Sequence, residues 1–264
     1  MEKITSLQNP KIKQIVKLRQ YKERQNTGCF IIEGYRELGL ALMSGIEIIN
    51  LFLCSELIKN EKRILGVDQE VITEVSEKVF SKLSCRENPD GFLAEAKMKE
   101  YKLAEMQLSQ NSLILILEAI EKPGNLGAIL RSADAAGVDA IIINNPKTDI
   151  YNPNVIRASQ GTLFTKQIVT ACFSETLAWL KEKKIKIFAT TSKATKIYSK
   201  VDFCQPSAIV MGAEDVGLGD NWLESADEKI KIPMKGKISS LNVSVSAAVI
   251  IFEALRQREL KVKS

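Results

Sequence analysis

Histidine is absent from the 264 residues of this sequence. A Ser-His-Asp triad, a Cys-His pair, a histidine general base and a histidine-bound metal are therefore excluded. Any chemistry has to use arginine, lysine, carboxylates, hydroxyls, amides or a bound cofactor. We accordingly expect an active site without a metal.

Paired cysteines and long apolar runs are also missing. No two of the five cysteines form a C-x-x-C pair, so a disulfide framework or a zinc ribbon is not expected. No apolar run approaches the 18 or so residues of a membrane span, and the N-terminus lacks a signal-peptide core. We therefore expect a cytoplasmic protein with no membrane partner. Aromatic residues make up only 6%, which predicts a core of Ile, Leu, Val and Ala.

The charges are unevenly placed along an otherwise ordinary globular composition. The chain carries 37 Lys+Arg against 32 Asp+Glu, a net charge of +5. Residues 1–24 hold seven basic and two acidic side chains, so this stretch alone has an excess equal to that of the whole chain. Such a stretch can follow a phosphate backbone, or it can be the solvated face of a helix. Both interpretations stay open at this point.

Hydrophobic patterning divides the chain near residue 105. Before it, the pattern predicts a helix from Pro10 to about Arg24, a helix over roughly 35–44, and strands at 29–34, 46–54 and 91–96. After it, a final helix is predicted over about 240–258, and strands are predicted at 113–118, 140–144, 186–190, 208–212 and 229–233. Strands that alternate with helices indicate a largely parallel sheet. We therefore predict an α/β protein with a small αβ domain over 1–105 and a larger domain over 106–264.

Three segments of the larger domain follow predicted strands, at the edge where open parallel sheets bind ligands. Asn125 and Arg131 lie at a strand-to-helix turn, and an ordinary helix would explain them equally well. A glycine-rich loop at 212–219 contains Glu214 and Asp215, which disfavour a phosphate ligand and suit a neutral or cationic one. The third segment has an irregular loop over 233–236 and then a helix for which Ser239 and Ser240 are candidate N-caps.

Together the three segments resemble, in order and spacing, the motifs of the SpoU (TrmH-type) RNA ribose 2′-O-methyltransferases of the SPOUT superfamily. The motif N-x-G-x-x-x-R corresponds to Asn125, Gly127 and Arg131. The motif G-x-E-x-x-G corresponds to Gly212, Glu214 and Gly217, and the motif I-P-M-x-G…S-L-N-V-S-V corresponds to 232–236 and 240–245. The resemblance covers about 112–258. Residues 1–105 are more loosely similar to the family's substrate-binding extension. Two departures are Asp215, after the motif glutamate, and Ser246, where alanine is usual.

The resemblance implies a parallel-sheet SPOUT domain whose C-terminal region forms a deep trefoil knot, with a small N-terminal αβ RNA-binding domain. It also implies a homodimer and S-adenosylmethionine as the cofactor. The residues of this sequence that it assigns to cofactor binding are Thr191, Gly212, Glu214, Gly217, Ile232, Met234 and Leu241.

For the reaction, the resemblance implies methyl transfer to a ribose 2′-hydroxyl, with a catalytic set of Asn125, Arg131, Ser240 and Asn242. An arginine with a pKa above about 12 is a poor general base. We therefore prefer a role in which Arg131 binds the adjacent phosphate and stabilises the developing alkoxide. Candidate RNA contacts are Arg157, Lys11, Lys13 and Arg19.

The basic N-terminus and the added domain favour ribosomal RNA over transfer RNA as the substrate. Two other classes stay open. One is a catalytically silent RNA-binding protein on the same fold. The other is a nucleotide-dependent oxidoreductase, which the lack of a G-x-G-x-x-G motif after the first strand of the α/β region disfavours.

Overall fold

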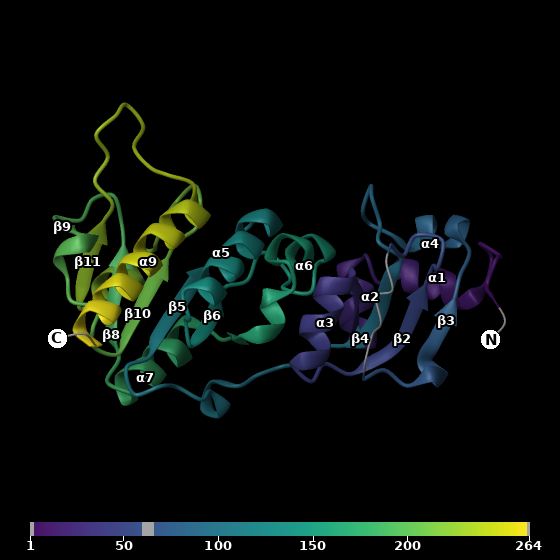
Figure 1. Cartoon of the computed structure of the whole chain (residues 1–264). Helices are drawn as coiled ribbons and strands as arrows, with labels where there is room; N and C mark the ends of the chain where they lie inside the picture. Colours follow the sequence, from purple (N-terminus) through teal and green to yellow (C-terminus); the bar gives the residue numbers. More distant parts are fainter. Residues whose placement is uncertain (1–2, 60–65, 263–264) are drawn as a thin grey trace. The chain divides into compact units, whose positions relative to one another are not determined.

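The computed structural model describes residues 3–59 and 66–262 of the chain and contains two compact units (Figure 1). Unit 1 comprises residues 1–99 together with 149–165, and unit 2 comprises residues 100–148 and 166–264. The predicted division at residue 105 treated the larger domain as one continuous segment. The structure instead places 149–165, from within that segment, in unit 1.

Unit 1 is built on a four-stranded sheet with the order β1-β4-β2-β3. Its strands are β1 (Cys29–Glu33), β2 (Ile48–Leu53), β3 (Ile72–Glu74) and β4 (Phe92–Lys97). Strand β4 pairs antiparallel with β1 and β2, and β3 lies parallel to β2. The helices of the first 99 residues are α1 (Pro10–Lys17), α2 (Tyr21–Thr27), α3 (Tyr35–Met43) and α4 (Glu77–Leu83). Apart from β3, these strands agree with the predicted ranges to within two residues.

The predicted single helix through Arg24 is wrong, because the chain forms two helices with a break over 18–20. Gln20 has an extended backbone with φ −88° and ψ 134°. The break leaves carbonyl groups at the end of α1, and Arg24 Nη1 donates to those of Leu18 and Arg19 at 2.9 and 2.8 Å. Arg24 is therefore buried in the fold and is withdrawn from the basic surface that residues 1–24 were expected to form.

The segment 149–165 completes unit 1. It contains α6 (Pro153–Ser159) and the 3₁₀ helix η3 (Thr162–Thr165). Arg24 forms a buried ion pair with Asp149, with Nη2 2.6 Å from Oδ2, and the Tyr151 ring lies 4.4 Å from that of Phe30. Phe164 packs on the same phenylalanine at 5.8 Å between ring centroids. These contacts are between residues more than 120 positions apart, so local patterning could not predict them.

Unit 2 contains a seven-stranded sheet with the order β7-β6-β5-β10-β8-β11-β9, in which every pair of neighbours is parallel. This confirms the predicted parallel α/β architecture. The strands are β5 (Leu113–Glu118), β6 (Ala140–Asn144), β7 (Gln167–Thr170), β8 (Lys186–Thr190), β9 (Lys196–Ile197), β10 (Ser207–Met211) and β11 (Glu228–Lys231). The pattern analysis did not predict β7 and β9, which are the two edge strands.

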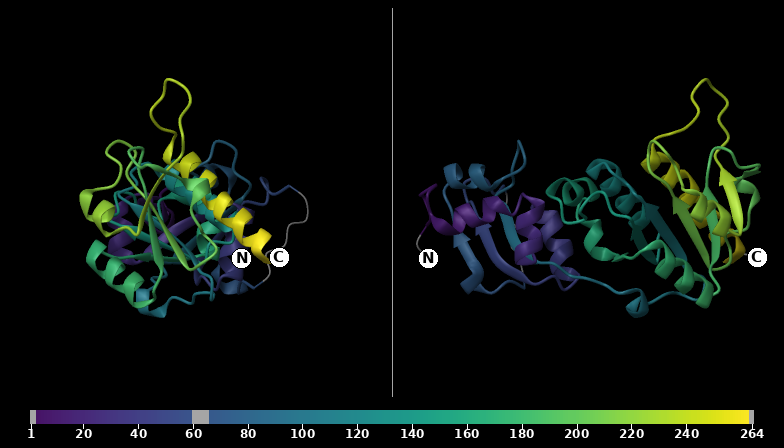
Figure 2. Two further views of the ribbon diagram at one scale, coloured as in Figure 1. Left: turned by 90° about the vertical axis from the view of Figure 1, so that its left-hand side faces the viewer. Right: turned by 180° about the vertical axis from the view of Figure 1, so that it is seen from behind.

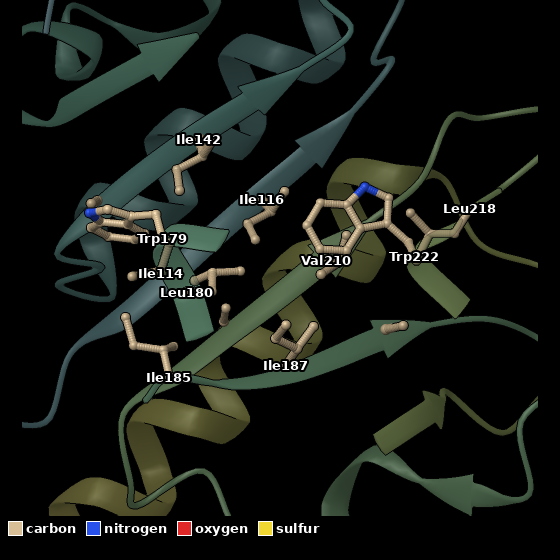
Figure 3. Packing of buried hydrophobic residues seen from close by; sticks show 13 residues of the cluster. Ile114, Ile116, Ile142, Trp179, Leu180, Ile185, Ile187, Val210, Leu218 and Trp222 are labelled. Carbon is tan, nitrogen blue, oxygen red and sulfur yellow. The ribbon is translucent and has the colours of Figure 1, made fainter. Parts of the chain in front are cut away.

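One face of this sheet carries the core drawn in Figure 3. Alternate residues of the central strands, such as Ile114, Ile116 and Val210, meet Trp179 and Leu180 of α7 (Phe173–Glu182). Trp222 of α8 (Asp220–Ser225) is fully buried there, and its Nε1 donates to Glu118 Oε2 at 3.0 Å. That bond fixes α8 to the end of β5.

Helices α5 (Pro123–Ala135) and α9 (Val243–Val262) pack against each other (Figures 1 and 2). The expected N-caps Ser239 and Ser240 are wrong, because α9 begins at Val243. Asn242 takes the capping role, and its Oδ1 accepts from the backbone N–H and the hydroxyl of Ser244 at 2.9 and 2.6 Å. The start of the last helix is thereby tied to Asn242. Among the described residues, no helix combines the length and apolar composition that a membrane crossing requires.

The Arg24–Asp149 pair gives a prediction about stability. Arg24→Ala would leave a carboxylate that is about one-tenth exposed without its partner, so we expect unit 1 to lose about 3–5 kcal/mol of unfolding free energy. Urea denaturation followed by circular dichroism measures this. The exposed pair Lys97–Glu47 provides the control, and Lys97→Ala should cost less than about 1 kcal/mol. Equal losses in the two variants would contradict the prediction.

Candidate functional site

A cavity of about 630 Å³ opens at the carboxyl edge of the unit 2 sheet. Three segments line it: residues 190–193 at the end of β8, residues 211–220 at the end of β10, and residues 230–232, 234 and 239–241 at and after the end of β11. The first turns of α9 add Val243, Ser246 and Ile250 to the wall, and α8 adds Leu223. Its volume lies within the range of small-molecule sites, and its position is where open parallel sheets bind ligands.

The loop after β10 is a tight hairpin that depends on a glycine. Ala213 and Gly217 exchange backbone hydrogen bonds at 3.2 and 3.1 Å. A Cβ at Gly212 would lie 2.3 Å from the carbonyl carbon of Gly217 and 2.5 Å from the Leu218 nitrogen. Backbone atoms cannot yield as a flexible side chain can, so only glycine permits this close approach. The backbone of residues 212 and 217–218 is therefore closely packed at this side of the cavity.

Side-chain hydrogen bonds join the three predicted motifs into a chain. Asn125 Nδ2 donates to Glu214 Oε1 at 2.8 Å, and Asn242 Nδ2 donates to Asn125 Oδ1 at 3.1 Å. Asn242 then caps α9 through Ser244, as described above. We call Glu214, Asn125, Asn242 and Ser244 the polar ladder. It connects the loop after β10, the first turn of α5 and the start of α9.

Glu214 is held as a carboxylate by its donors. Burial acts to raise its pKa, but hydrogen bonds from Asn125 and from the backbone N–H groups of Glu121 and Lys122 outweigh burial and leave the pKa below its ordinary value. Glu214 is therefore ionised at neutral pH. With Asp215 and Asp220, it gives this side of the cavity an acidic lining.

The structure brings together all seven residues predicted to bind a cofactor. Each of them lines the cavity: Thr191, Gly212, Glu214, Gly217, Ile232, Met234 and Leu241. Pattern analysis did not find other lining residues, notably Ser192, Lys193 and Ser246. The position of Ser192 and Lys193 directly after a buried strand could have indicated them.

The four residues predicted to be catalytic are only partly brought together. Ser240 lines the cavity, and Asn125 and Asn242 belong to the polar ladder. Arg131 is exposed on α5 and lies outside the cavity lining. Asn125 is itself in the first turn of α5, so six helical residues, or about 600° of rotation, separate the two side chains. After whole turns are removed, about 120° separates the two side chains, so they do not lie on the same face of the helix.

The predicted RNA contacts all lie in unit 1, and their environments differ. Lys11 Nζ donates to Thr73 Oγ1 at 3.3 Å and sits over the Phe52 ring. Arg19 Nη2 donates to the carbonyls of Lys82 and Ser84 at 2.6 and 2.8 Å. Lys13 and Arg157 are exposed, and Arg157 donates to Asn154 of its own helix. Lys11 and Arg19 thus make hydrogen bonds within unit 1, although Arg19 is also exposed.

The depressed pKa of Glu214 predicts a pH-dependent effect on stability. Glu214→Gln should lower the unfolding free energy by about 1 kcal/mol at neutral pH, because charged hydrogen bonds become neutral ones. A lowered folded pKa contributes stability above the ordinary pKa of about 4.3, and that stability is lost as the pH falls through the folded value. The difference from wild type, measured by urea denaturation, should therefore shrink below about pH 4.

Asp215→Asn is the matched control, since it removes the same charge from the neighbouring, exposed position. It should change stability little at any pH. A pH-independent loss for Glu214→Gln, or an equal loss for Asp215→Asn, would refute the role given to the ladder.

Comparison with known families gives two matches. The profile described as the SpoU rRNA Methylase family matches residues 112–252. The profile described as an MRM3-like substrate binding domain matches residues 9–94. The first match contains all three motifs and covers more than half of the chain.

Individual relatives agree with these matches. A Bacillus subtilis (strain 168) protein named 23S rRNA (guanosine(2553)-2′-O)-methyltransferase RlmP is 32% identical over 255 residues, covering 96% of this chain and 98% of the relative. A crystal structure of an RNA 2′-O ribose methyltransferase is 43% identical, with a TM-score of 0.84, and covers 98% of this chain and all of that one. An AdoMet-bound rRNA methyltransferase from Sinorhizobium meliloti is 28% identical over 97% of both chains, with a TM-score of 0.86. This chain belongs to the SpoU rRNA methylase family.

Proposed function

We propose that the protein transfers a methyl group from S-adenosylmethionine to the 2′-hydroxyl of a ribose in ribosomal RNA. The observation that carries the proposal is the polar ladder, which joins all three family motifs and reaches the wall of one cavity through Glu214. Relatives named as 23S rRNA 2′-O-methyltransferases support ribosomal RNA over transfer RNA as the substrate. A cytoplasmic location accords with that substrate and with the five free cysteines.

The cavity suits S-adenosylmethionine in shape and charge. Gly212 keeps the backbone wall free of a Cβ, and Ile232, Met234 and Leu241 supply apolar surface. The acidic side formed by Glu214 and Asp215 favours a cation over a phosphate. When bound, the cofactor supplies an electrophilic methyl group on a sulfonium. We assign its binding to Thr191, Gly212, Glu214, Gly217, Ile232, Met234 and Leu241.

The acceptor ribose would be oriented by groups at the mouth of this cavity. Asn125 and Asn242 fix the loop that carries Ser240, and the exposed Ser240 hydroxyl is available to hydrogen-bond the acceptor. The ribose oxygen would form a C–O bond to the methyl group as the bond between that methyl group and the cofactor's sulfur breaks, which would leave a neutral thioether, and the hydroxyl proton would pass to water. Arg131 would bind the neighbouring phosphate and stabilise negative charge on that oxygen, because a guanidinium keeps its own proton.

We further propose that the chain after β11 is threaded as a deep trefoil knot and that two copies pair. The contact of α9 with α5 and the gathering of three loops around one cavity support this arrangement. The exposed apolar side chains Val245 and Phe252 lie seven residues apart on α9, and therefore on one face of that helix. Apolar surface of this kind is typical of an interface.

The dimer gives a mass that can be measured. Light scattering at micromolar concentration should give about twice the 29.4 kDa chain mass. Phe252→Glu should shift the distribution toward the monomer, because a charge would replace an apolar contact. Lys229→Glu, on the exposed part of β11, is the control and should leave the mass unchanged. A wild-type monomer under these conditions would exclude the pairing.

The chemical identity of the acceptor can be tested directly. A ribosomal RNA fragment should accept a methyl group from labelled S-adenosylmethionine, and a fragment with one 2′-deoxy substitution at the modified nucleotide should accept none. Binding of the two fragments should differ little. Methylation of the deoxy fragment would place the methyl group on a base and would overturn the proposal.

The same assay provides a second arm with Arg131→Ala. Turnover should fall at least about 100-fold, because an electrostatic contact made in the transition state is removed. Calorimetric titration with S-adenosylmethionine should give an unchanged affinity, since Arg131 lies outside the cavity lining. Turnover near the wild-type rate would remove Arg131 from the catalytic set.

A further inference from the structure

The loop between β11 and α9 has a middle part to which the methyl-transfer site assigns no role. Its two ends belong to the cavity, which Met234 lines at one end and residues 239–241 line at the other. Residues 235–238 between them do not line the cavity, and the loop extends beyond the edge of the sheet (Figures 1 and 2). We call residues 233–241 the lysine loop.

The sequence around the lysine loop carries charge of one sign. Residues 229–252 contain four lysines and no aspartate or glutamate. Two of these lysines, Lys235 and Lys237, lie in the lysine loop itself. The motif I-P-M-x-G…S-L-N-V-S-V leaves both of these positions open. The two positive charges are therefore a feature of this chain and not of the motif.

Lys235 and Lys237 are exposed to solvent. Within the part of the chain that the structure describes, neither side chain forms a hydrogen bond or an ion pair. Other lysines of unit 2 do have partners, since Lys186 and Lys196 share the carboxylate of Glu228 at 2.7 and 2.9 Å. An ammonium group without a carboxylate beside it offers its whole charge, and all three of its N–H donors, to a ligand.

The lysine loop is held at its ends and is open in its middle. Strand β11 fixes one end in the sheet, and Asn242 fixes the other through the polar ladder. Among the described residues, residues 233–241 take part in no backbone–backbone hydrogen bond of a turn or loop. A Cβ at Gly236, between the two lysines, would meet no atom within 4 Å. A ligand can therefore reach this part of the loop without displacing an existing contact.

The charge of the cavity differs from that of the lysine loop. The charged side chains that line the cavity are three carboxylates and two ammonium groups, those of Glu214, Asp215, Asp220, Lys193 and Lys231. The lining therefore has one net negative charge, which favours a cationic cofactor and repels phosphates. An RNA that places a 2′-hydroxyl in this cavity has to keep its phosphates outside. Positive charge is then needed beside the mouth, where the lysine loop lies.

We propose that Lys235 and Lys237 bind phosphates of the RNA strand beside the acceptor nucleotide and hold that strand across the mouth of the cavity. Arg131 is assigned the phosphate next to the acceptor hydroxyl, and the two lysines take phosphates further along the strand. Their Cα atoms are at most about 7 Å apart, so both can contact one short stretch of backbone. Ser240 follows in the same loop, which places the held strand next to the hydroxyl assigned to the acceptor. This inference rests on the proposed function, because it takes RNA as the substrate.

A second copy of the chain is the other partner that an exposed loop of this unit could meet. Ile238, which is 62% exposed, is the side chain that such an interface would use. The neighbouring lysines argue against it, because lysine is depleted at protein interfaces, where an unpaired ammonium group would lose its water. The test therefore includes the mass of the protein.

The test removes the two charges and then restores them in another form. In the full-length protein, Lys235→Gln with Lys237→Gln should weaken binding of a fluorescein-labelled 12-nucleotide single-stranded RNA by at least about 10-fold at 0.1 M salt. The slope of log K against log salt should become shallower by about 1.4. Fluorescence anisotropy measures both quantities. Lys235→Arg with Lys237→Arg should retain the affinity and the slope. Loss of affinity with no change in slope, or an equal loss in the arginine variant, would overturn the phosphate contacts.

A control variant with the same change of charge is available at the opposite edge of the sheet. Lys181→Gln with Lys184→Gln alters two exposed lysines at and after the end of α7, before β8 begins. The length of β8, about 16 Å, separates them from the cavity edge and exceeds the screening length of about 10 Å at 0.1 M salt. This control should change the RNA affinity less than about 2-fold. An equal loss would reduce the effect to overall charge and overturn the assignment to the lysine loop.

The ends of the lysine loop line the cofactor cavity, so a merely structural effect of the glutamine variant has its own signature. Calorimetric titration with S-adenosylmethionine should give the wild-type affinity, because neither lysine lines the cavity. In the methyl-transfer assay, KM for RNA should rise at least about 10-fold while kcat changes less than about 2-fold. A weaker cofactor affinity or a lower kcat would overturn the role in RNA binding. A light-scattering mass that shifted toward the monomer would assign the loop to an interface between copies instead.

Failure of this inference can be distinguished from failure of the proposed function. If the wild-type protein methylates RNA and the glutamine variant binds RNA as tightly as wild type, the assignment of the loop falls and the activity stands. If RNA affinity depends on the two lysines but the wild-type protein transfers no methyl group, the phosphate contacts stand and the activity falls.

Discussion

The carboxylate of Glu214 links the loop after β10 to the start of α5 and, through Asn125, to the start of α9. The Glu214 carboxylate accepts hydrogen bonds from the Asn125 amide and from the backbone N–H groups of Glu121 and Lys122, which precede α5. The Asn125 side-chain oxygen in turn accepts from the amide of Asn242, at the start of α9. Each contact joins segments about 90 to 120 residues apart in sequence. Because most of the donors to this charged acceptor come from distant segments, the conformation of the loop after β10 depends on both helices. The positions of the motifs relative to one another therefore depend on this group.

The order of the strands explains why these segments can meet at all. Strand β10 lies between β5 and β8, so the loop after β10 is adjacent to the turn that follows β5 and opens α5. Strand β11 pairs with β8, which brings the loop after β11 to the same edge. In a parallel sheet all these loops leave from the carboxyl ends of their strands. The crossed strand order thus gathers residues near 191, 214 and 240 around one cavity, and Asn125 is joined to it through Glu214.

The sequence could predict the features that depend on residues close together in the chain. Buried strands such as 113–118 are visible in local hydrophobicity. The cofactor residues that the family resemblance implies, with Thr191 added from its place after the strand 186–190, all line the cavity. The break after Lys17 was not visible, because it is stabilised by Arg24 and by its partner Asp149, 125 positions away. Similarly, Ser240 satisfies the local rule for a helix cap, yet Asn242 caps α9 because the ladder places it there. Local rules failed where a distant partner decided the outcome.

The segment 149–165 changes how the two matched regions of the chain should be understood. It lies inside the match to the SpoU rRNA Methylase family but packs in unit 1 with residues of the MRM3-like match. Residues 9–94 alone would lack the partner of a buried arginine and the aromatic rings that cover Phe30. The methylase sequence therefore completes the core of unit 1, so the boundary between the two matches is not a boundary between independently complete folding units.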